Sequence, residues 1–403
     1  MLTGNACGSP HRPRCEKYPM TIPTHFRALL LFLCLGASTA FASTWILTTS
    51  TLEKQTIHLS AITPQGISVD HDDATTQTLL WPDISILRQS EVAPFLPNAE
   101  PFVLYLRTGQ RIAGQPVRLS ADQLLWKNGL AGEMPISMET VRGFARTGVE
   151  LPASAGKEDL VQLINKDELK GIVDAADSGL TVQQGAQSSA PIAWDNIKAV
   201  VLAQVGNAGQ SAAAAFWLTA ADASVYAADS LQLQDQSLRL TRQGTTLVLP
   251  LSAILRIENR TGKATFLAWL TPSSFAYTPY LQFSDQQSEP MRILSDIRAR
   301  DVLYCTAIEL RPKTVLTYRA PAAGRFRLAY AASKTGGLTD MSFTLILGGK
   351  IVYQNPSIRS PKPAAIADIA VNKDETLTME VGFGKNFDAQ DYLQILDAAF
   401  VAK

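Results

Sequence analysis

The chain has 403 residues, 46% of them apolar and 18% charged, which is enough for several domains with cores of their own and argues against a disordered protein. Lysine plus arginine and aspartate plus glutamate number 36 each, so the formal net charge is zero. Because no half of the chain is basic, we expect neither nucleic acid nor an anionic membrane surface as a partner.

The first predicted element is an export signal over residues 1–42. It contains Arg27, an apolar run and a small-x-small cleavage site at Ala40-Phe41-Ala42. Met20 is an alternative start, because the residues before it add nothing that a signal needs. We expect a mature chain from Ser43 without a membrane span, exported to the periplasm, the cell surface or the medium. An uncleaved anchor is the alternative.

Cysteine and histidine are scarce after the signal. Cys305 is the one cysteine that remains, so we expect no internal disulfide and a small core residue at this position. No histidine follows His71, which excludes a His-dependent catalytic set or zinc site in the rest of the chain. No nucleophile motif or alternating strand–helix pattern is present, so the sequence predicts that the protein is not an enzyme.

Residues 45–260 predict short strands that recur in four units. Each unit has a strand that starts near a large aliphatic residue and a later aliphatic residue that closes the unit, and successive units are 56 to 58 residues apart. The closing residues are Ile84, Val141, Ile197 and Ile254, and three positions before them stand Trp81, Met138, Trp194 and Leu251.

This recurrence predicts small β-barrels or meanders of SH3 or Sm size. The expected boundaries are 43–93, 94–152, 153–208 and 209–262. Tryptophans recur in these units, at Trp81, Trp126 and Trp194. They are either sugar-stacking platforms or, as their periodic positions favour, core residues.

The stretch SFTLILGGKIVYQNP, Ser342 to Pro356, contains a Gly-Gly-Lys that looks like part of a phosphate-binding loop. A P-loop needs an earlier glycine at a fixed spacing, Ser or Thr after the lysine, and a following helix. Here Lys350 is followed by Ile351 and a strand pattern. Two glycines between strands predict a two-residue hairpin, so no nucleotide is expected.

Seven short strand patterns follow Thr314 at regular spacing, which predicts an antiparallel β-sandwich in the last third of the chain. They are VLTYRAP, RFRLAYAA, SFTLIL, KIVYQNP, AAIADIAV, ETLTMEVGFG and YLQILDAAFV.

Residues 271–403 resemble the NPCBM family of carbohydrate-binding modules, first noted beside glycoside hydrolase domains. Five segments match family landmarks in order: TPYL (278–281), VLTY (315–318), RFRLAYAA (325–332), FTLILGGKIVY (343–353) and DYLQILDAAF (391–400). The resemblance implies a galactose-binding-like jelly-roll sandwich and a glycan ligand. The expected fold class is therefore all-β, with tandem small repeats followed by this sandwich.

Several polar and small positions depart from the family pattern. The family's Gly-Leu-Gly followed by His-Ser reads Ala307-Ile308-Glu309 and then Arg311-Pro312 here, and the His and Trp of the closing motif are Tyr392 and Ile395. Two hypotheses follow. The chain is an exported, non-catalytic glycan-binding protein, or it is a structural or protein-interaction component of an envelope complex whose sugar site has degenerated.

Six residues are candidates for ligand contacts, because aromatic rings suit the apolar face of a sugar and carboxylates suit its hydroxyls. They are Tyr318, Tyr330, Asp340, Asp391, Tyr392 and Asp397. For each the alternative is structural: tyrosines in the core, and aspartates that cap turns or hold the closing strand.

The segment NFDAQDY, residues 386–392, is rich in oxygen ligands. It predicts either a structural calcium ion or, since it lacks regular ligand spacing, a turn rich in Asn and Asp. No other cofactor is expected.

Overall fold

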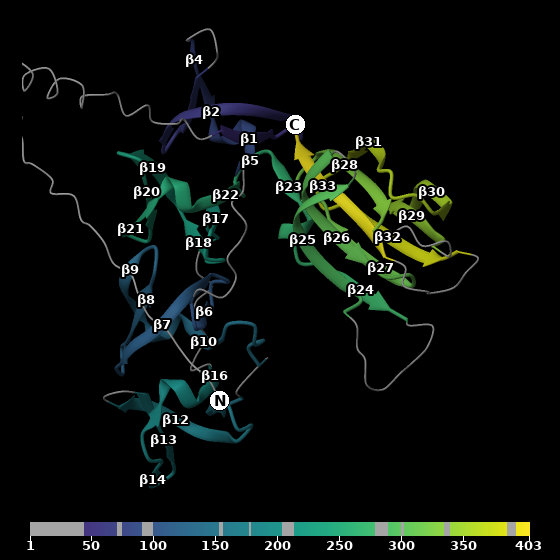
Figure 1. Cartoon of the computed structure of the whole chain (residues 1–403). Coiled ribbons are helices and arrows are strands. Elements are labelled where there is room, and N and C mark those ends of the chain that lie inside the picture. Colours follow the sequence, from purple (N-terminus) through teal and green to yellow (C-terminus); the bar gives the residue numbers. More distant parts are fainter. Residues whose placement is uncertain are drawn as a thin grey trace, which may run out of the picture. The chain divides into compact units, whose positions relative to one another are not determined.

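The computed structural model describes residues 44–403, apart from 71–74, 91–99, 153–155, 177–178, 204–212, 279–288, 300–301, 334–338 and 385–391. The predicted export signal and most of the predicted calcium segment therefore lie outside the described residues. The described part consists of antiparallel strands and single 3₁₀ turns, without an α-helix. The predicted all-β class is confirmed (Figure 1).

Four segments of residues 44–259 share one order of elements: an initial set of strands, a 3₁₀ turn and a closing strand. Repeat 1 contains β1 (Thr44–Thr49), β2 (Lys54–Thr63), β3 (Gly66–Asp70), β4 (Thr76–Leu80), η2 (Trp81–Asp83) and β5 (Ile84–Gln89). Repeat 2 contains β6 (Phe102–Leu106), β7 (Arg111–Leu119), β8 (Gln123–Asn128), β9 (Gly132–Ser137), η3 (Met138–Thr140) and β10 (Val141–Arg146).

The third and fourth segments vary this plan slightly. Repeat 3 contains β11 (Asp159–Leu163), β12 (Glu168–Ala176), β13 (Gly179–Gln184), β14 (Gln187–Ser188), β15 (Ile192–Ala193), η4 (Trp194–Asn196) and β16 (Ile197–Val201). Repeat 4 contains β17 (Phe216–Ala220), β18 (Val225–Ala228), β19 (Ser230–Gln234), β20 (Ser237–Arg242), β21 (Thr245–Pro250), η5 (Leu251–Ala253) and β22 (Ile254–Asn259).

The 3₁₀ turns explain the large apolar residue before each closing strand. Each turn starts at Trp81, Met138, Trp194 or Leu251, and its carbonyl accepts the N–H of the first residue of the closing strand. The closing strand then pairs with the first strand of its own repeat, as in β5 with β1. Each turn thus connects the meander to the closing strand and places an apolar side chain in or against the core of the repeats.

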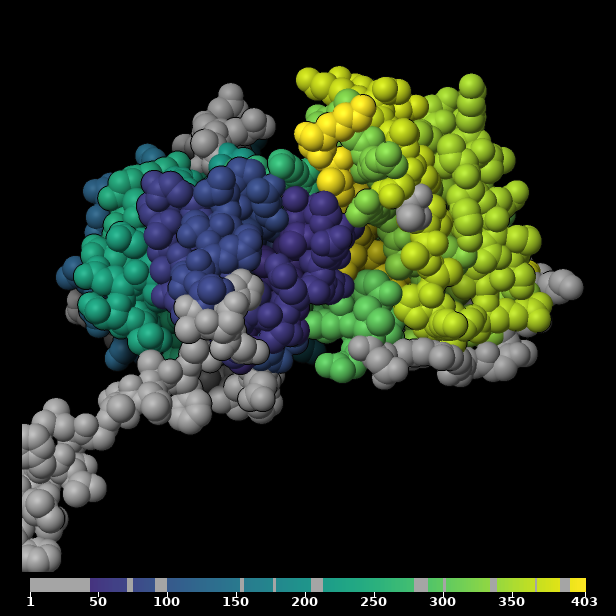
Figure 2. Space-filling model, turned by 90° about the horizontal axis from the view of Figure 1, so that it is seen from above, coloured from purple at the N-terminus to yellow at the C-terminus, as the bar shows by residue number. Residues whose placement is uncertain are grey.

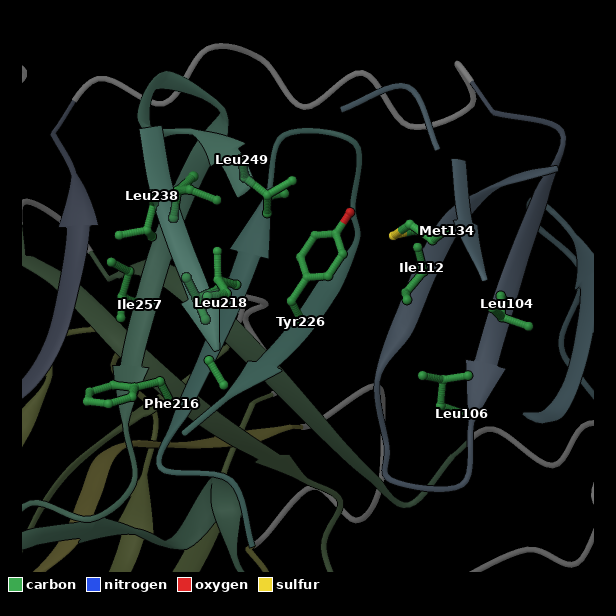
Figure 3. Packing of buried hydrophobic residues seen from close by; sticks show 14 of the residues in the cluster. Leu104, Leu106, Ile112, Met134, Phe216, Leu218, Tyr226, Leu238, Leu249 and Ile257 are labelled. Atoms are coloured by element: carbon green, nitrogen blue, oxygen red, sulfur yellow. The ribbon is translucent and has the colours of Figure 1, made fainter. Parts of the chain in front are cut away.

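The repeats are joined by their closing strands. β5 pairs with β22, with Leu87 opposite Ile257, and β10 pairs with β16, with Phe144 opposite Val200. A side chain at Gly143 would meet the carbonyl of Val200 at 2.2 Å, so the β10–β16 pair needs a glycine there. Figure 3 shows the apolar side chains of repeats 2 and 4, such as Leu104 and Leu218, which are fully buried.

The C-terminal part contains two sheets. The first consists of β23 (Ala264–Phe266), β25 (Met291–Ala299), β26 (Val302–Leu310), β28 (Gly324–Ala332), β31 (Ala364–Val371) and β33 (Leu393–Ala402). The second consists of β24 (Ser274–Tyr277), β27 (Thr314–Arg319), β29 (Met341–Leu347), β30 (Lys350–Ile358) and β32 (Thr376–Phe383). All seven predicted strands are present. A further 3₁₀ turn, η6 (Leu267–Trp269), follows β23.

The two sheets enclose a shared core, to which both contribute fully buried side chains such as Phe326 and Phe343. The strand β23 precedes the predicted boundary at residue 271 and pairs with β33. Within that boundary, the strand patterns did not indicate β24 or the long hairpin of β25 and β26. Figure 2 shows the surface of these C-terminal strands, coloured from green to yellow.

The Gly348-Gly349 pair is a two-residue hairpin, as predicted. Leu347 lies opposite Lys350, and the glycines have φ values of 54° and 80°. Both values fall in the left-handed region that glycine adopts without strain.

Candidate functional site

Five of the connections that cross between the two sheets share one end of the sandwich, whereas the β27–β28 and β31–β32 connections cross at the other end. These five run from β24 to β25, β26 to β27, β28 to β29, β30 to β31 and β32 to β33. We call their end of the sandwich the loop end. The Gly348-Gly349 hairpin lies at the opposite end, because β29 and β30 run away from the loop end before they turn.

Tyr392 stands at the loop end, immediately before β33. Its hydroxyl accepts hydrogen bonds from Arg311 Nε and Nη2 at 3.0 and 2.8 Å. The guanidinium carbons of Arg292 and Arg311 lie 4.9 and 5.0 Å from the centre of its half-buried ring. The ring is therefore held by two cations, each in the range of a cation–π contact.

Glu309 and Gln394 lie beside this tyrosine. Arg292 forms an ion pair with the carboxylate of Glu309, and Gln394 Nε2 donates to Glu309 Oε1 at 3.3 Å. The carboxylate is buried, whereas the side chain of Arg292 is 45% exposed. The last residues of β26 and the first of β25 and β33 thus present a charge pair and an amide together. We call Arg292, Glu309, Arg311, Tyr392 and Gln394 the Tyr392 cluster.

Arg311 carries a positive charge that no carboxylate among the described residues neutralises. Burial lowers the pKa of its guanidinium, but hydrogen bonds to the Tyr392 and Tyr277 hydroxyls outweigh this and leave the pKa raised. Lys313 is exposed nearby, and its ammonium lies 5.5 Å from the ring centre of Phe383. Arg311 within the Tyr392 cluster and Lys313 close to it in the chain are thus two cations that form no ion pair with a described carboxylate.

A second polar group follows alternate positions of the edge strand β30. Asp340 is fully buried, and its carboxylate accepts hydrogen bonds from Ser357 Oγ at 2.7 Å and Arg359 Nη2 at 2.9 Å. Arg359 is more than half exposed, and the hydrogen bond to Asp340 raises its pKa. Asp340 thus holds the end of β30 in place, while the outer face of Arg359 stays in solvent.

Tyr330 of β28 contacts the same series of alternate β30 residues, through Tyr353 and Asn355. It is 3% exposed, and its hydroxyl contacts the Tyr353 hydroxyl at 2.5 Å and accepts a hydrogen bond from Asn355 Nδ2 at 2.8 Å. Burial, followed by the hydrogen bond to Tyr330, raises the pKa of Tyr353 to about 12. Because the ring of Tyr330 packs against Phe343, it offers no face to a ligand. Tyr330 is therefore a core residue, which is the structural alternative to a ligand contact.

The remaining predicted ligand residues are dispersed. Tyr318 is 2% exposed in the sandwich core, and burial raises its pKa to about 12. Asp397 is buried in β33, where it accepts the Thr306 N–H at 2.9 Å and pairs with Lys54 of repeat 1 at 2.6 Å. Asp391 lies outside the described residues. The structure thus brings Tyr330 and Asp340 together along β30. Among the predicted ligand residues that the structure describes, Tyr392 is the one that is not buried.

The repeat tryptophans take core positions rather than platforms. Trp81 and Trp126 are 5% and 0% exposed, and Trp194 packs partly buried against the same core. The indole N–H groups of Trp81 and Trp126 donate to the carbonyls of Thr63 and Ala113. Buried indoles with satisfied N–H groups are structural.

The sequence patterns missed Arg292, and they treated Glu309 and Arg311 only as departures from the family motif. Those departures from the motif were the one feature of the sequence that could have pointed to the Tyr392 cluster. Where the family has small residues and His-Ser, this chain has the carboxylate and guanidinium that surround Tyr392.

Within the described ranges, no three His, Cys, Asp or Glu side chains gather as metal ligands. Nor does that part of the chain include a helix that is long and apolar enough to cross a bilayer.

No family profile matches the sequence, and no curated protein does. Several solved structures are similar at low scores. A CBM51 module of a Clostridium perfringens GH95 protein, in complex with methyl-galactose, is 15% identical, with a TM-score of 0.28, over 34% of this chain and 99% of that one. The CBM51-2 and INT domains of Clostridium perfringens ZmpB are 13% identical with a TM-score of 0.28, over 41% of this chain and 36% of that one. A CBM36 module with calcium and xylotriose is 14% identical with a TM-score of 0.17, over 23% of this chain and 76% of that one.

Proposed function

We propose that this chain is an exported, non-catalytic protein that binds a glycan at the loop end of its C-terminal sandwich, as a member of the NPCBM type. The observation that carries the proposal is the Tyr392 cluster, in which Arg311 is held against Tyr392 by two hydrogen bonds and lacks a carboxylate partner among the described residues. Guanidinium and amide N–H groups donate hydrogen bonds to sugar hydroxyls and carboxylates.

The cluster suits binding because its groups are fixed before a ligand arrives. Arg311 is oriented by two tyrosine hydroxyls, and Arg292 by the buried Glu309. Side chains that are already ordered lose little conformational entropy on association. The proposal needs no catalytic residue, since the cluster supplies only recognition groups.

The test uses the mature chain from Ser43, because β23 and Lys54 lie outside a 271–403 fragment and contact β33. We expect the chain to be retained by a polysaccharide in affinity electrophoresis and to bind defined glycans on an array. Arg311→Gln should raise the dissociation constant by about tenfold or more, since a charge-assisted hydrogen bond is lost.

Arg325→Gln is the matched control. Arg325 is an exposed arginine near the start of β28, at the end of the sandwich away from the Tyr392 cluster, and its ion pair with Asp368 is 4.0 Å long. Its loss should leave binding unchanged. Equal weakening in both variants, or no bound glycan in a broad panel, would remove the proposal.

A second function is favoured by the free edge of β30. Ile351 and Val352 are 62% and 41% exposed on this strand, which pairs with β29 on one side and with no described strand on the other. Edge strands with exposed apolar residues accept an added strand from a partner protein. If no glycan binds while Ile351→Lys removes a specific cross-link to an envelope protein, the interaction role would replace the glycan-binding one.

A further inference from the structure

A cavity of about 440 Å³ lies away from the Tyr392 cluster, between residues of β6, β7, repeat 4 and β25. Its walls combine apolar side chains, including Val225 and Leu255, with Arg111, Arg256 and Asp296. This volume is within the range of small-molecule sites, which join apolar walls to a few fixed polar groups.

Arg256 is the unusual member of the lining. It is 2% exposed, its Nε donates to Glu258 at 3.0 Å, and its Nη1 donates to the Cys305 carbonyl at 2.6 Å. Its Nη2 is also buried, yet no described residue accepts a hydrogen bond from it. A buried donor without an acceptor costs about 1–3 kcal/mol. An acceptor from a bound molecule would remove this cost.

The charges around the cavity favour an anion. Asp296 lies 3.1 Å from Arg256 Nη1 and 3.0 Å from Arg88 Nε, so two arginines share this carboxylate. Arg111 is exposed on the cavity wall and forms no ion pair with a described residue. With Glu258 and its second partner Arg260, the group contains four guanidinium groups and two carboxylates.

Asp296 stands at an irregularity in the pairing of β25 with β26. Ser295 pairs with Thr306 and Ile297 pairs with Tyr304, whereas Asp296 between them has no register partner and has φ at 55°. A positive φ is uncommon for a residue other than glycine. The Asp296 carboxylate accepts a hydrogen bond from Arg256 and so helps to hold the guanidinium in the cavity wall.

We propose that this cavity binds a small organic carboxylate of up to monosaccharide size. Its carboxylate accepts hydrogen bonds from Arg256 Nη2 and Arg111, and its less polar side lies against Val225 and Leu255. Planar carboxylates match the guanidinium fork, which is why arginine is common in such sites. The site shares no residue with the Tyr392 cluster, so each proposal can fail without the other.

The test is calorimetric titration of the mature chain with glucuronate and, as a neutral analogue, glucose. We expect saturable binding of glucuronate and at least tenfold weaker binding of glucose. Arg111→Gln should weaken glucuronate binding by about tenfold. Ser295→Trp, which places a large ring at an exposed position of the cavity lining, should abolish it.

Arg118→Gln is the control, because Arg118 is an exposed arginine of the same strand that does not line the cavity. Arg256 itself is left intact, since its loss would leave the Asp296 and Glu258 carboxylates with Arg88 and Arg260 alone as their cations. Equal affinity for glucose and glucuronate, no binding of either, or unchanged binding in Ser295→Trp would each overturn the proposal.

Discussion

The four repeats and the sandwich use polar side chains in different ways. In the repeats, buried polar groups serve the backbone: Asn259 donates to the Trp81 and Ile84 carbonyls, and the Trp126 indole donates to Ala113. At the loop end of the sandwich, Arg311 instead bonds to tyrosine hydroxyls that are themselves partly accessible. These buried groups in the repeat cores therefore stabilise the scaffold, whereas the sandwich holds recognition groups at its loop end.

The largest expected effect tests whether the buried residues of the repeats act mainly on stability. Trp126 is fully buried and packs against Phe144 at 6.0 Å between ring centres. Trp126→Ala should cost about 3–5 kcal/mol of stability, measured by urea unfolding, because it opens a large cavity.

Glycan retention by the folded Trp126→Ala protein should be unchanged at low temperature. Trp217→Ala is the control, since Trp217 is half-buried and covered mainly by Arg260 at 4.5 Å, and it should cost less. Selective loss of glycan binding in Trp126→Ala would contradict a scaffold role for repeat 2.

A smaller effect concerns a buried residue of the sandwich. Burial raises the pKa of Tyr318 from 10.0 to about 12, so the folded protein keeps this proton while the unfolded chain loses it. The stabilising contribution is complete below pH 10 and is lost as the pH rises toward 12. It is worth up to about 2–3 kcal/mol.

The melting temperature of Tyr318→Phe, measured by circular dichroism, should therefore fall less between pH 9 and pH 11.5 than that of the unmodified protein. At pH 7 the two melting temperatures should be similar. Glycan binding should be retained, because this ring lies in the core. A variant that keeps its stability at both pH values but binds no glycan would return Tyr318 to the list of ligand contacts.

The smallest effect sharpens the contrast between the two ends of the sandwich. Gly349 has φ at 80°, and a side chain there would meet no atom within 4 Å. Gly349→Ala should thus cost about 1 kcal/mol through backbone strain alone. Gly349→Asn, which tolerates this conformation better, should cost less. Loss of glycan binding in either variant would show that the hairpin end takes part in recognition.

The sequence predicted the fold better than the site, for a physical reason. Recurring apolar positions such as Trp81 and Ile84 and the glycine pair at 348–349 act through local backbone geometry, which a linear pattern records. The Tyr392 cluster joins the first residues of β25 and β33 to the last of β26, and only the packed sandwich brings these together. Tyr318 and Tyr330 were proposed because tyrosine suits sugars, but strand alternation turns both rings inward.

The most direct test of the account is nuclear magnetic resonance of the labelled mature chain, titrated with the glycan best retained in electrophoresis. Binding at the loop end predicts saturable shifts at Arg292, Glu309, Arg311 and Tyr392, with the Gly348-Gly349 hairpin unaffected. Shifts confined to the hairpin end or to the repeats, or no shifts from any glycan, would contradict it.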